Sequence, residues 1–354
     1  MELVARGLTR ERYEVHLGLV MSPDTSADMS AEASADGMVK GVRVHALGAR
    51  RARVAAFALL RLVWRLQPDV ILSGAAEISF LVLLLRGLLP GRTRVLIRQN
   101  GTVSSVRKMG VPRYTRLLYR LLYRRADRII CQSRAMAEDM MREVGIGAEK
   151  LAVLPNPVDV DGIRRAMNDA YAWEGPGPHL LAVGRLSHEK GFDLLIEAFA
   201  TVRTRFADAR LILAGSGREE AELRRLCHVY GVEDAVQFAG RVNCPYIYFP
   251  GATLFVLPSR CEGMPNALLE ASSAGLPIVA TPASGGIVDL LRGKRGAWVA
   301  PEISAAALAQ TMVAALKEIR PGERFPVMSS GDRGALDRSV ARSVAGPSAR
   351  AAAN

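Results

Sequence analysis

The sequence predicts an α/β protein with two domains, each built on a doubly wound parallel sheet. The chain has 354 residues, of which 49% are hydrophobic and 23% are charged, and this length fits two cores of ~100–200 residues each. Short apolar runs alternate with longer amphipathic stretches, as in successive β-α-β units. Proline and glycine interrupt this alternation near the middle of the chain, at Leu154–Pro157 and Gly175–Pro178.

The first half of the chain is expected to form one domain over residues 1–154, followed by a linker region over residues 155–178. Its predicted helices are Glu2–Thr9, Val54–Leu66, Tyr114–Arg125 and Ser133–Val144. Its predicted strands are Tyr13–Val20, Asp69–Ser73, Arg94–Arg98 and Arg128–Cys131. Helices of this length between strands indicate parallel crossover connections.

The second half repeats the pattern and is expected to form another domain over residues 179–320. Its predicted strands are His179–Val183, Arg210–Ala214, Val236–Phe238, Thr253–Leu257 and Pro277–Ala280. Its predicted helices are Gly191–Arg205, Arg218–Tyr230, Pro265–Ala274 and Ala305–Ile319. Residues 321–354 are rich in Gly, Ser, Ala and Arg without an apolar period, which predicts a disordered tail.

The cysteine pattern and the apolar runs exclude several classes of protein. Cys131, Cys227, Cys244 and Cys261 are far apart and form no C-x-x-C pair, so neither a zinc site nor a disulfide framework is expected. The longest apolar run, Ile78–Leu89, contains Arg86 and is shorter than the ~20 residues of a spanning helix. No signal peptide is recognisable at the start. We therefore expect a protein of the cytoplasm with free thiols.

A basic pair flanks the loop after the expected strand His179–Val183. Arg185 leaves the strand and Lys190 begins the next helix, so both cations can face one anion beyond the sheet edge, where ligands of open α/β sheets bind. A diphosphate fits, because an arginine fork clamps phosphate oxygens and a lysine adds a point charge. The ordinary alternative is a solvated pair of surface cations.

Two further strand-to-helix junctions carry suitable residues. The turn Gly215–Gly217 follows an apolar strand and allows a ligand to approach the backbone, although such turns often form only a tight corner. Pro265 is expected as the first residue of a helix, so the next residues offer N–H groups to an anion. Glu262 and Glu270 beside these amides can accept hydrogen bonds from sugar and ribose hydroxyls, or they are solvated glutamates.

An ordered set of motifs over roughly residues 126–315 resembles the family-4 type of retaining GT-B glycosyltransferases. The set comprises Gly184-Arg185-Leu186 with Glu189-Lys190-Gly191, the glycine turn at 215–217, Val236-x-Phe238-x-Gly240, Leu257-Pro258-Ser259, Glu262-Gly263 with a seven-residue gap to Glu270, and the run from Ala274 to Ala280. The resemblance implies a GT-B fold, in which two Rossmann-like domains face each other across a cleft. The C-terminal domain would bind a nucleotide-diphospho-sugar.

The resemblance also implies roles for individual residues. Arg185, Lys190 and Glu262 would be catalytic: the two cations neutralise the diphosphate and Glu262 contacts the donor sugar. The other implied substrate contacts are Glu270 at the ribose, Gly215, Gly263, Asn266, Ala267 and Leu268 near the diphosphate or sugar, and Arg241, in segment 240–243, near the nucleobase. The implied donor is linked to UDP or GDP and reacts with retention, and no metal or other cofactor is expected.

The first domain departs from the family pattern at two places. The family begins with a strand and a glycine-rich loop, whereas Glu2–Thr9 already reads as the helix that follows them. This strand and loop are therefore expected to be missing, and with them part of the site. The family often has a histidine after a first-domain strand, where this chain has Arg98, Gln99 and Asn100. Arg98 and Asn100 are expected to contact the donor sugar there, or to be plain loop residues.

Positive charge is concentrated in the first half, which has a net charge of +11 over residues 1–150, against +1 over residues 151–354. The segment Arg107–Arg125 combines cations with Tyr and Leu. We expect it to lie on an anionic membrane at the inner face, where each cation contributes ~1 kcal/mol. A core-packing helix with a solvated basic face is the alternative. Nucleic acid is not expected as a partner, because no recognition motif accompanies the charge.

The function expected from these features is a transfer reaction in polysaccharide biosynthesis. A hexose or N-acetylhexosamine would pass from a nucleotide-diphospho-sugar to a glycan or a lipid-linked glycan. Two alternatives stay open. A nucleotide-sugar epimerase of the same fold would convert the donor without an acceptor, and a non-catalytic module would only bind a nucleotide sugar or a membrane.

Overall fold

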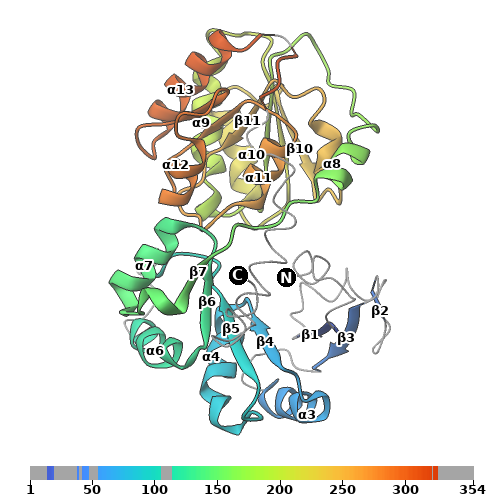
Figure 1. The fold of residues 1–354 in the computed structure, drawn as a ribbon. Helices are drawn as coiled ribbons and strands as arrows, with labels where there is room; N and C mark the ends of the chain where they lie inside the picture. Colours follow the sequence, from blue (N-terminus) through green and yellow to red (C-terminus); the bar gives the residue numbers. More distant parts are fainter. Residues whose placement is uncertain are drawn as a thin grey trace, which may run out of the picture. The chain divides into compact units, whose positions relative to one another are not determined.

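The computed structural model describes residues 14–19, 38–39, 42–47, 55–104, 114–320 and 322–325. Its contacts divide the chain into two compact units: unit 1 contains residues 1–157 and 331–354, and unit 2 contains residues 158–330 (Figure 1). Each unit has the α/β architecture with parallel strands that the sequence predicts. The expected helix Glu2–Thr9 and the tail beyond residue 325 lie outside the described residues. No described helix is long and apolar enough to cross a membrane.

Unit 1 contains two sheets in its described part. In the larger sheet, the parallel strands lie in chain order: β4 (Val70–Ser73), β5 (Arg94–Arg98), β6 (Arg128–Cys131) and β7 (Leu151–Val153). In the smaller sheet, β3 (Val42–Ala46) pairs in parallel with β1 (His16–Leu19) and in antiparallel fashion with β2 (Met38–Val39). The strands β5 and β6 have the predicted bounds, whereas the three-residue strand β7 is too short to give a sequence pattern.

Helices lie between the strands of unit 1. They are α3 (Ala56–Leu66), α4 (Ala76–Leu84), α6 (Tyr114–Leu122) and α7 (Arg134–Val144), with the 3₁₀ turns η2 (Leu85–Leu88), η3 (Tyr123–Arg125) and η4 (Ala148–Lys150). The apolar run Ile78–Leu89 thus forms most of α4 and all of η2, a helix that the sequence analysis does not predict. The helix α7 begins at Ser133, whose Oγ accepts a hydrogen bond from Met136 N, and ends at the left-handed Gly145. Buried residues of these helices and of β5 and β6 form one core.

Unit 2 is a six-stranded parallel sheet with the strand order β10-β9-β8-β11-β12-β13. The strands are β8 (His179–Val183), β9 (Arg210–Ala214), β10 (Val236–Gly240), β11 (Leu254–Leu257), β12 (Ile278–Ala280) and β13 (Ala297–Val299). Numbered from β8, this order is 3-2-1-4-5-6, the order of the dinucleotide-binding Rossmann fold. The order reverses between β8 and β11, so ligands of such a sheet bind beyond the carboxyl ends of these two strands.

The strands of unit 2 bury alternate side chains on opposite faces. Leu180 and Ala182 of β8 pack in one cluster with residues of α9 (Phe192–Arg203), α10 (Glu220–Val229) and α13 (Ala305–Glu318). Leu181 of the same strand packs in a second cluster with residues of α8 (Val160–Ala166), α11 (Asn266–Ser273) and α12 (Gly285–Leu291). This two-residue period, with helices on both faces, is the doubly wound sheet that the sequence predicts.

The boundary between the units differs from the predicted linker. Residues 158–178 belong to unit 2, where Ile163 of α8 is 1% exposed within the second cluster. Asp159 starts α8 by accepting a hydrogen bond from Gly162 N at 3.0 Å. Residues 322–325, which the prediction places in the tail, contact unit 2: Phe325 N donates to Gly275 O at 2.7 Å, and Arg324 donates to Phe249 O and Pro250 O.

Candidate functional site

The candidate site lies at the carboxyl ends of β8 and β11, where the strand order of unit 2 reverses. The loop after β8 carries Arg185 and the 3₁₀ turn η5 (His188–Lys190), and the loop after β11 carries residues 258–265. The two loops are joined by the backbone, since Arg260 N donates to Glu189 O at 2.8 Å. They are joined a second time by Arg260, which forms a bidentate ion pair with Asp193 at 2.6 Å for both contacts. The switch point is therefore a connected structure.

The ion pair of Lys190 and Glu262 is the centre of this structure. Lys190 Nζ donates to Glu262 Oε1 at 2.6 Å, and Ser259 Oγ donates to the same oxygen at 2.7 Å. The lysine side chain is 23% exposed and the glutamate side chain 10% exposed, so both charges are largely removed from water. Each charge is compensated by the other.

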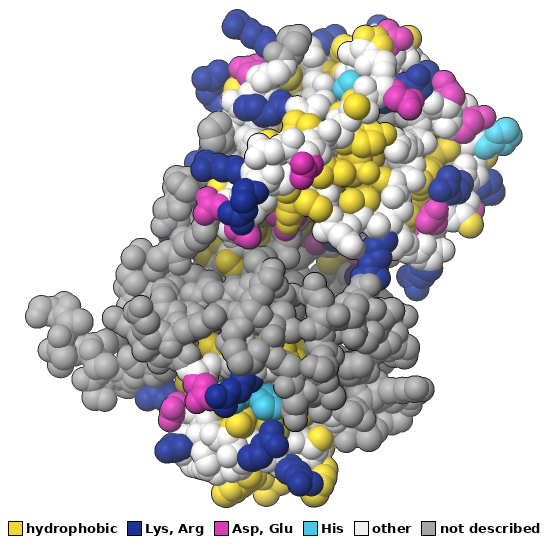
Figure 2. Space-filling view, turned by 90° about the vertical axis from the view of Figure 1, so that its right-hand side faces the viewer, with side chains coloured by type: hydrophobic (Ala, Val, Ile, Leu, Met, Phe, Trp, Pro, Cys, Tyr) yellow, Lys and Arg dark blue, Asp and Glu magenta, His cyan; other side chains and the backbone are white. Residues whose placement is uncertain are grey.

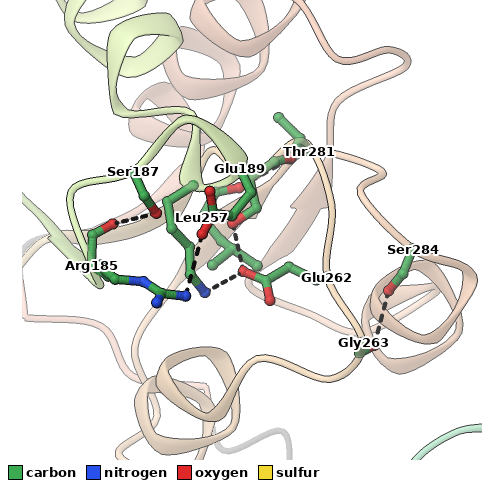
Figure 3. Close-up of polar contacts among 10 residues, drawn as sticks. Arg185, Ser187, Glu189, Leu257, Glu262, Gly263, Thr281 and Ser284 are labelled. Carbon is green, nitrogen blue, oxygen red and sulfur yellow. Dashed lines mark hydrogen bonds and ion pairs between the residues drawn. The ribbon is translucent and has the colours of Figure 1, made fainter. Parts of the chain in front are cut away.

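Arg185 is the exposed member of the group. Its side chain is 71% exposed, and its Nη2 contacts Glu189 Oε1 at 3.3 Å. Figure 3 shows the side chains of Arg185, Glu189 and Glu262 pointing toward one another from the two loops. The arrangement thus offers one partly buried and one exposed cation at the same strand ends, and each has a carboxylate partner that a diphosphate can displace.

Hydroxyl groups hold the loop after β11 in place. Thr281 Oγ1, at the end of β12, donates to Ser259 O at 2.5 Å and lies 3.3 Å from Leu257 O. Ser284 Oγ, at the start of α12, donates to Gly263 O at 3.2 Å (Figure 3). The backbone that carries Ser259 and Glu262 is therefore fixed by the neighbouring strand and helix.

Glycines allow these loops to approach one another closely. Gly191 has φ +66°, and a Cβ atom there would lie 2.2 Å from Pro258 O. Gly215 has φ +152°, and a Cβ atom there would lie 1.8 Å from Gly184 O. The sequence analysis assigns Gly215 to close approach of a ligand, whereas the structure gives it a second reason: it packs directly on the backbone of the loop that carries Arg185.

The helix α11 presents its amino end to the same edge of the sheet. It begins at Asn266, and Pro265 precedes it in an extended conformation with ψ 122°. The prediction that Pro265 is the first helical residue is therefore wrong by one position, because its ψ angle is not helical. Asn266, Ala267 and Leu268 remain the first three residues of the helix, so their N–H groups point out of its amino end.

Glu270 lies one turn further along α11 and is mostly buried. Burial raises the pKa of its carboxyl group, and a hydrogen bond from the Tyr246 hydroxyl opposes this shift. Tyr246 comes from the 3₁₀ turn η6 (Pro245–Tyr248), five residues after the exposed Arg241 in the loop that follows β10. This carboxyl group thus titrates at a higher pH than an ordinary glutamate.

The structure brings the predicted residues of unit 2 to one sheet edge. Arg185, Lys190, Gly215, Arg241, Glu262, Gly263 and residues 266–270 all follow carboxyl ends of its strands. Arg98 and Asn100 belong to unit 1, where they follow β5. Sequence reasoning missed Ser259, Tyr246, Thr281 and the pair Asp193–Arg260. Ser259 belongs to the motif Leu257-Pro258-Ser259 but was given no role there, and the partners of the others become visible only in three dimensions.

Models of known protein families match both halves of the chain. The family described as "Glycosyltransferase Family 4" matches residues 1–161, and the family described as "Glycosyl transferases group 1" matches residues 177–318. The chain is 32% identical over 218 residues to the putative colanic acid biosynthesis glycosyltransferase WcaL of Escherichia coli K12, covering 59% of this chain and 52% of that protein. The chain thus spans about half the length of this curated relative.

Solved structures agree in fold. Sucrose-phosphate synthase from Thermosynechococcus elongatus matches with a TM-score of 0.73 at 18% identity, over 95% of this chain and 87% of that one. HepE of Anabaena in complex with UDP and glucose matches with a TM-score of 0.71 at 16% identity, over 93% and 91% of the two chains. With the family models over both units and a Rossmann strand order in unit 2, the chain belongs to the GT-B glycosyltransferases of family 4.

Proposed function

We propose that the protein transfers a hexose or an N-acetylhexosamine from a nucleotide-diphospho-sugar to a glycan or lipid-linked glycan, with retention of configuration. The observation that carries this proposal is the pairing of Lys190 with Glu262 beside Arg185 at the strand ends of unit 2. A diphosphate would take both cations and the amide end of α11. Glu262, once released by Lys190, would accept hydrogen bonds from the donor sugar.

In the proposed reaction, the site acts mainly through electrostatics. As the bond between the sugar and the diphosphate breaks, negative charge grows on the leaving nucleoside diphosphate. Lys190, Arg185 and the N–H groups at residues 266–268 would stabilise this charge more than they stabilise the bound donor. The acceptor hydroxyl would then attack the face that the leaving group vacates, and its proton would pass to an oxygen of the leaving diphosphate. The scheme needs no metal ion, since side chains and amides supply the positive charge.

Relatives support the nature of the donor and of the acceptor. HepE of Anabaena has been solved with UDP and with UDP-glucose. A Campylobacter jejuni relative, 31% identical over 49% of this chain and 47% of its own length, is named as an N-acetylgalactosaminyltransferase whose name includes a diphospho-undecaprenol saccharide. We therefore propose a UDP- or GDP-linked donor, with its base beside Arg241, and a saccharide acceptor of polysaccharide biosynthesis.

The test of this function measures donor turnover with and without an acceptor. Release of nucleoside diphosphate only in the presence of a saccharide acceptor supports a transferase. Isomerisation of the donor without an acceptor would identify a nucleotide-sugar epimerase. Binding without turnover under either condition would leave only a nucleotide-sugar-binding module, and the transferase proposal would be rejected.

Glu270 predicts that stability and nucleotide affinity change in opposite directions with pH. Since burial raises the pKa of its carboxyl group in the folded state, the folded protein holds a proton that the unfolded chain releases near pH ~4.3. The free energy of unfolding therefore falls as the pH rises from this value through the raised pKa. The ionised carboxylate is the better acceptor for a ribose diol, so nucleotide affinity should rise over the same window.

Urea unfolding and UDP titration at several pH values check this prediction. Glu270→Gln should remove the contribution of Glu270 to both pH dependences, whereas Glu318→Gln, at an exposed position of α13, should remove neither. If Glu270→Gln leaves the pH dependence of UDP affinity intact, Glu270 is not the ribose ligand.

We also propose that unit 1 rests peripherally on the anionic inner face of a membrane. Residues 107–113 of the predicted basic segment lie outside the described residues. The helix α6 belongs to the described part of the segment. Its Tyr114, Leu117 and Leu121 are 64%, 55% and 60% exposed, and it also carries Arg116 and Arg120. Exposed apolar side chains next to cations suit an interfacial helix.

A second surface of unit 1 has the same character. Phe57 and Trp64 of α3 and Leu88 of η2 are 77%, 57% and 57% exposed, and together with Arg61 they help to line a hollow of about 640 Å³. On the face drawn in Figure 2, hydrophobic side chains lie beside Lys and Arg at the end of unit 1 that carries α3. Because α4 contacts both η2 and α6, the two surfaces flank the same helix.

Cosedimentation with vesicles tests this docking. The protein should bind vesicles rich in phosphatidylserine and should bind neutral phosphatidylcholine vesicles much less. Leu117→Glu together with Trp64→Glu should weaken binding by at least about tenfold, since each buried side chain contributes roughly 1.5–3 kcal/mol. Val229→Glu, at a 59% exposed position of unit 2, is the matched control. Equal binding to both kinds of vesicle, or equal loss in the control, would argue against the proposed surfaces.

A further inference from the structure

A second polar cluster lies at the carboxyl ends of the strands of unit 1. Arg98, at the end of β5, directs Nη2 to Asn156 Oδ1 at 2.5 Å and Nη1 to Asn100 Oδ1 at 3.3 Å. Gln132, directly after β6, donates from Nε2 to Asn100 Oδ1 at 3.1 Å. Asn100 Nδ2 donates to Gly74 O, after β4. The cluster therefore connects the ends of all four strands of this sheet, the edge at which open parallel sheets bind ligands.

The charge of Arg98 has no acidic partner in this cluster. The two side chains that its guanidinium contacts are neutral amides, and burial lowers the pKa of Arg98. Another partly buried arginine of the same unit, Arg86, is instead paired with Asp127 at 3.1 Å. A partly desolvated cation without a counter-ion costs free energy unless an anion joins it. The cluster is thus suited to an anionic ligand.

Gln132 supplies an independent indication of a ligand. Its side chain is 3% exposed, and its Oε1 is one of only two buried side-chain N or O atoms without a hydrogen-bond partner in the described part of the chain. A buried amide oxygen that lacks a donor is unfavourable by about 1–3 kcal/mol. A hydroxyl group that donates to Oε1 would remove this cost. The ligand that satisfies both groups carries an oxyanion and at least one hydroxyl group.

We propose that this cluster binds a saccharide carrying an oxyanion, a phosphate or a carboxylate, with Arg98 on the anion and Gln132 Oε1 on a hydroxyl group. This assignment deepens the proposed function. It rests on that function in one respect, namely that the bound saccharide is the acceptor. The acceptor is then a sugar phosphate, a lipid-diphosphate sugar or a uronic acid, as opposed to a neutral glycan. Asn100 and Asn156 act as positioning residues, because their oxygens orient the guanidinium.

Binding of simple probes to the full chain tests the inference. Glucose 6-phosphate and glucuronate both combine a sugar with an oxyanion, and they distinguish a phosphate from a carboxylate. Glucose lacks the anion, and inorganic phosphate lacks the sugar. In calorimetric titrations, at least one of the first two should bind at least tenfold more tightly than glucose and than inorganic phosphate. The affinity should fall with added NaCl, as expected for an ion pair. Equal affinity for glucose would overturn the proposal.

Variants of the cluster locate this binding. Arg98→Gln should lower the affinity for the anionic sugar by about ten- to a hundredfold, which is the usual effect of losing a charged hydrogen-bond donor. Arg98→Lys should recover part of the affinity, because it restores the charge without the fork. Gln132→Leu should lower the affinity for the anionic sugar and leave the affinity for inorganic phosphate unchanged. Arg92→Gln removes the same charge from an exposed position of unit 1 and should change nothing.

UDP titration of the same proteins separates this inference from the proposed function. If the parent protein binds neither UDP nor GDP, the proposed function fails whatever the anionic sugars do. If one of the two nucleotides binds and neither anionic sugar does, the inference fails alone. If Arg98→Gln abolishes UDP binding at an unchanged melting temperature and leaves the anionic sugar bound, Arg98 serves the donor, and the inference is overturned. If Arg98→Gln has a lowered melting temperature, Arg98→Lys takes its place in this comparison.

Discussion

Lys190→Ala should reduce kcat/KM for sugar transfer by about a hundred- to a thousandfold, the usual effect of removing one charge-stabilising donor from an active site. The physical reason is that Lys190 is the more buried of the two cations proposed to bind the diphosphate and that its Nζ lies 2.6 Å from Glu262 Oε1. Initial rates of nucleoside diphosphate release with a saturating acceptor measure the effect. UDP titration of the same variant shows how much of it arises from lost binding.

A second substitution, at the partner Glu262, distinguishes the effect of Lys190→Ala on activity from its effect on stability. Removing the lysine leaves Glu262 largely buried with Ser259 Oγ as its remaining polar contact, so Lys190→Ala should also lower the melting temperature. Lys190→Ala with Glu262→Gln should recover the melting temperature but not the activity. Lys294→Ala, at an exposed loop position of unit 2, should change neither. Full activity of Lys190→Ala would remove this residue from the proposed mechanism.

Gly215→Ala should destabilise unit 2 by on the order of 3 kcal/mol or more. The new Cβ atom would lie 1.8 Å from Gly184 O in a backbone conformation with φ +152°, so the loop that carries Arg185 has to move. Urea unfolding followed by the fluorescence of Trp173 and Trp298, both in unit 2, measures the change. Because the loop moves, UDP affinity should fall as well.

Gly231→Ala is the matched control for this effect. Gly231 has φ +62°, and no atom lies within 4 Å of the position of its Cβ. The substitution therefore adds conformational strain of roughly 1–2 kcal/mol without a steric clash. A loss of stability in Gly215→Ala no greater than in Gly231→Ala would mean that the contact with Gly184 O relaxes without cost.

The elements with strong local patterns could be predicted from the sequence. The strands β5, β6, β8 and β9 have the predicted bounds, because each is an apolar run that begins with a basic residue or histidine and is followed by a glutamine or a glycine. The helix α4 was missed because its residues are almost all apolar, which leaves no helical period in the sequence. The shorter elements β2, β3, β7, α8, α12 and β13 were also missed. Each has seven residues or fewer, so its own sequence carries little periodicity.

The candidate site was predictable in its residues but not in its contacts. Arg185, Lys190, Glu262 and Glu270 stand beside recognisable strand ends, and topology alone brings them to one edge. The ion pair between Lys190 and Glu262 joins residues 72 positions apart, and sequence reasoning treated the lysine as an available cation. The cluster around Arg98 likewise depends on Gln132 and Asn156, whose amide side chains look like ordinary surface residues in the sequence.

The contact between Lys190 and Glu262 has a consequence for the end of the catalytic cycle. In the free protein the carboxylate occupies the place on the ammonium group that a phosphate oxygen would take. In the proposed reaction, Glu262 would stay close to Lys190 while the spent nucleotide leaves, and it would rebind the lysine at a high effective concentration. Glu262 would then compete with the product for Lys190, so the protein would give up some donor affinity in return for faster product release.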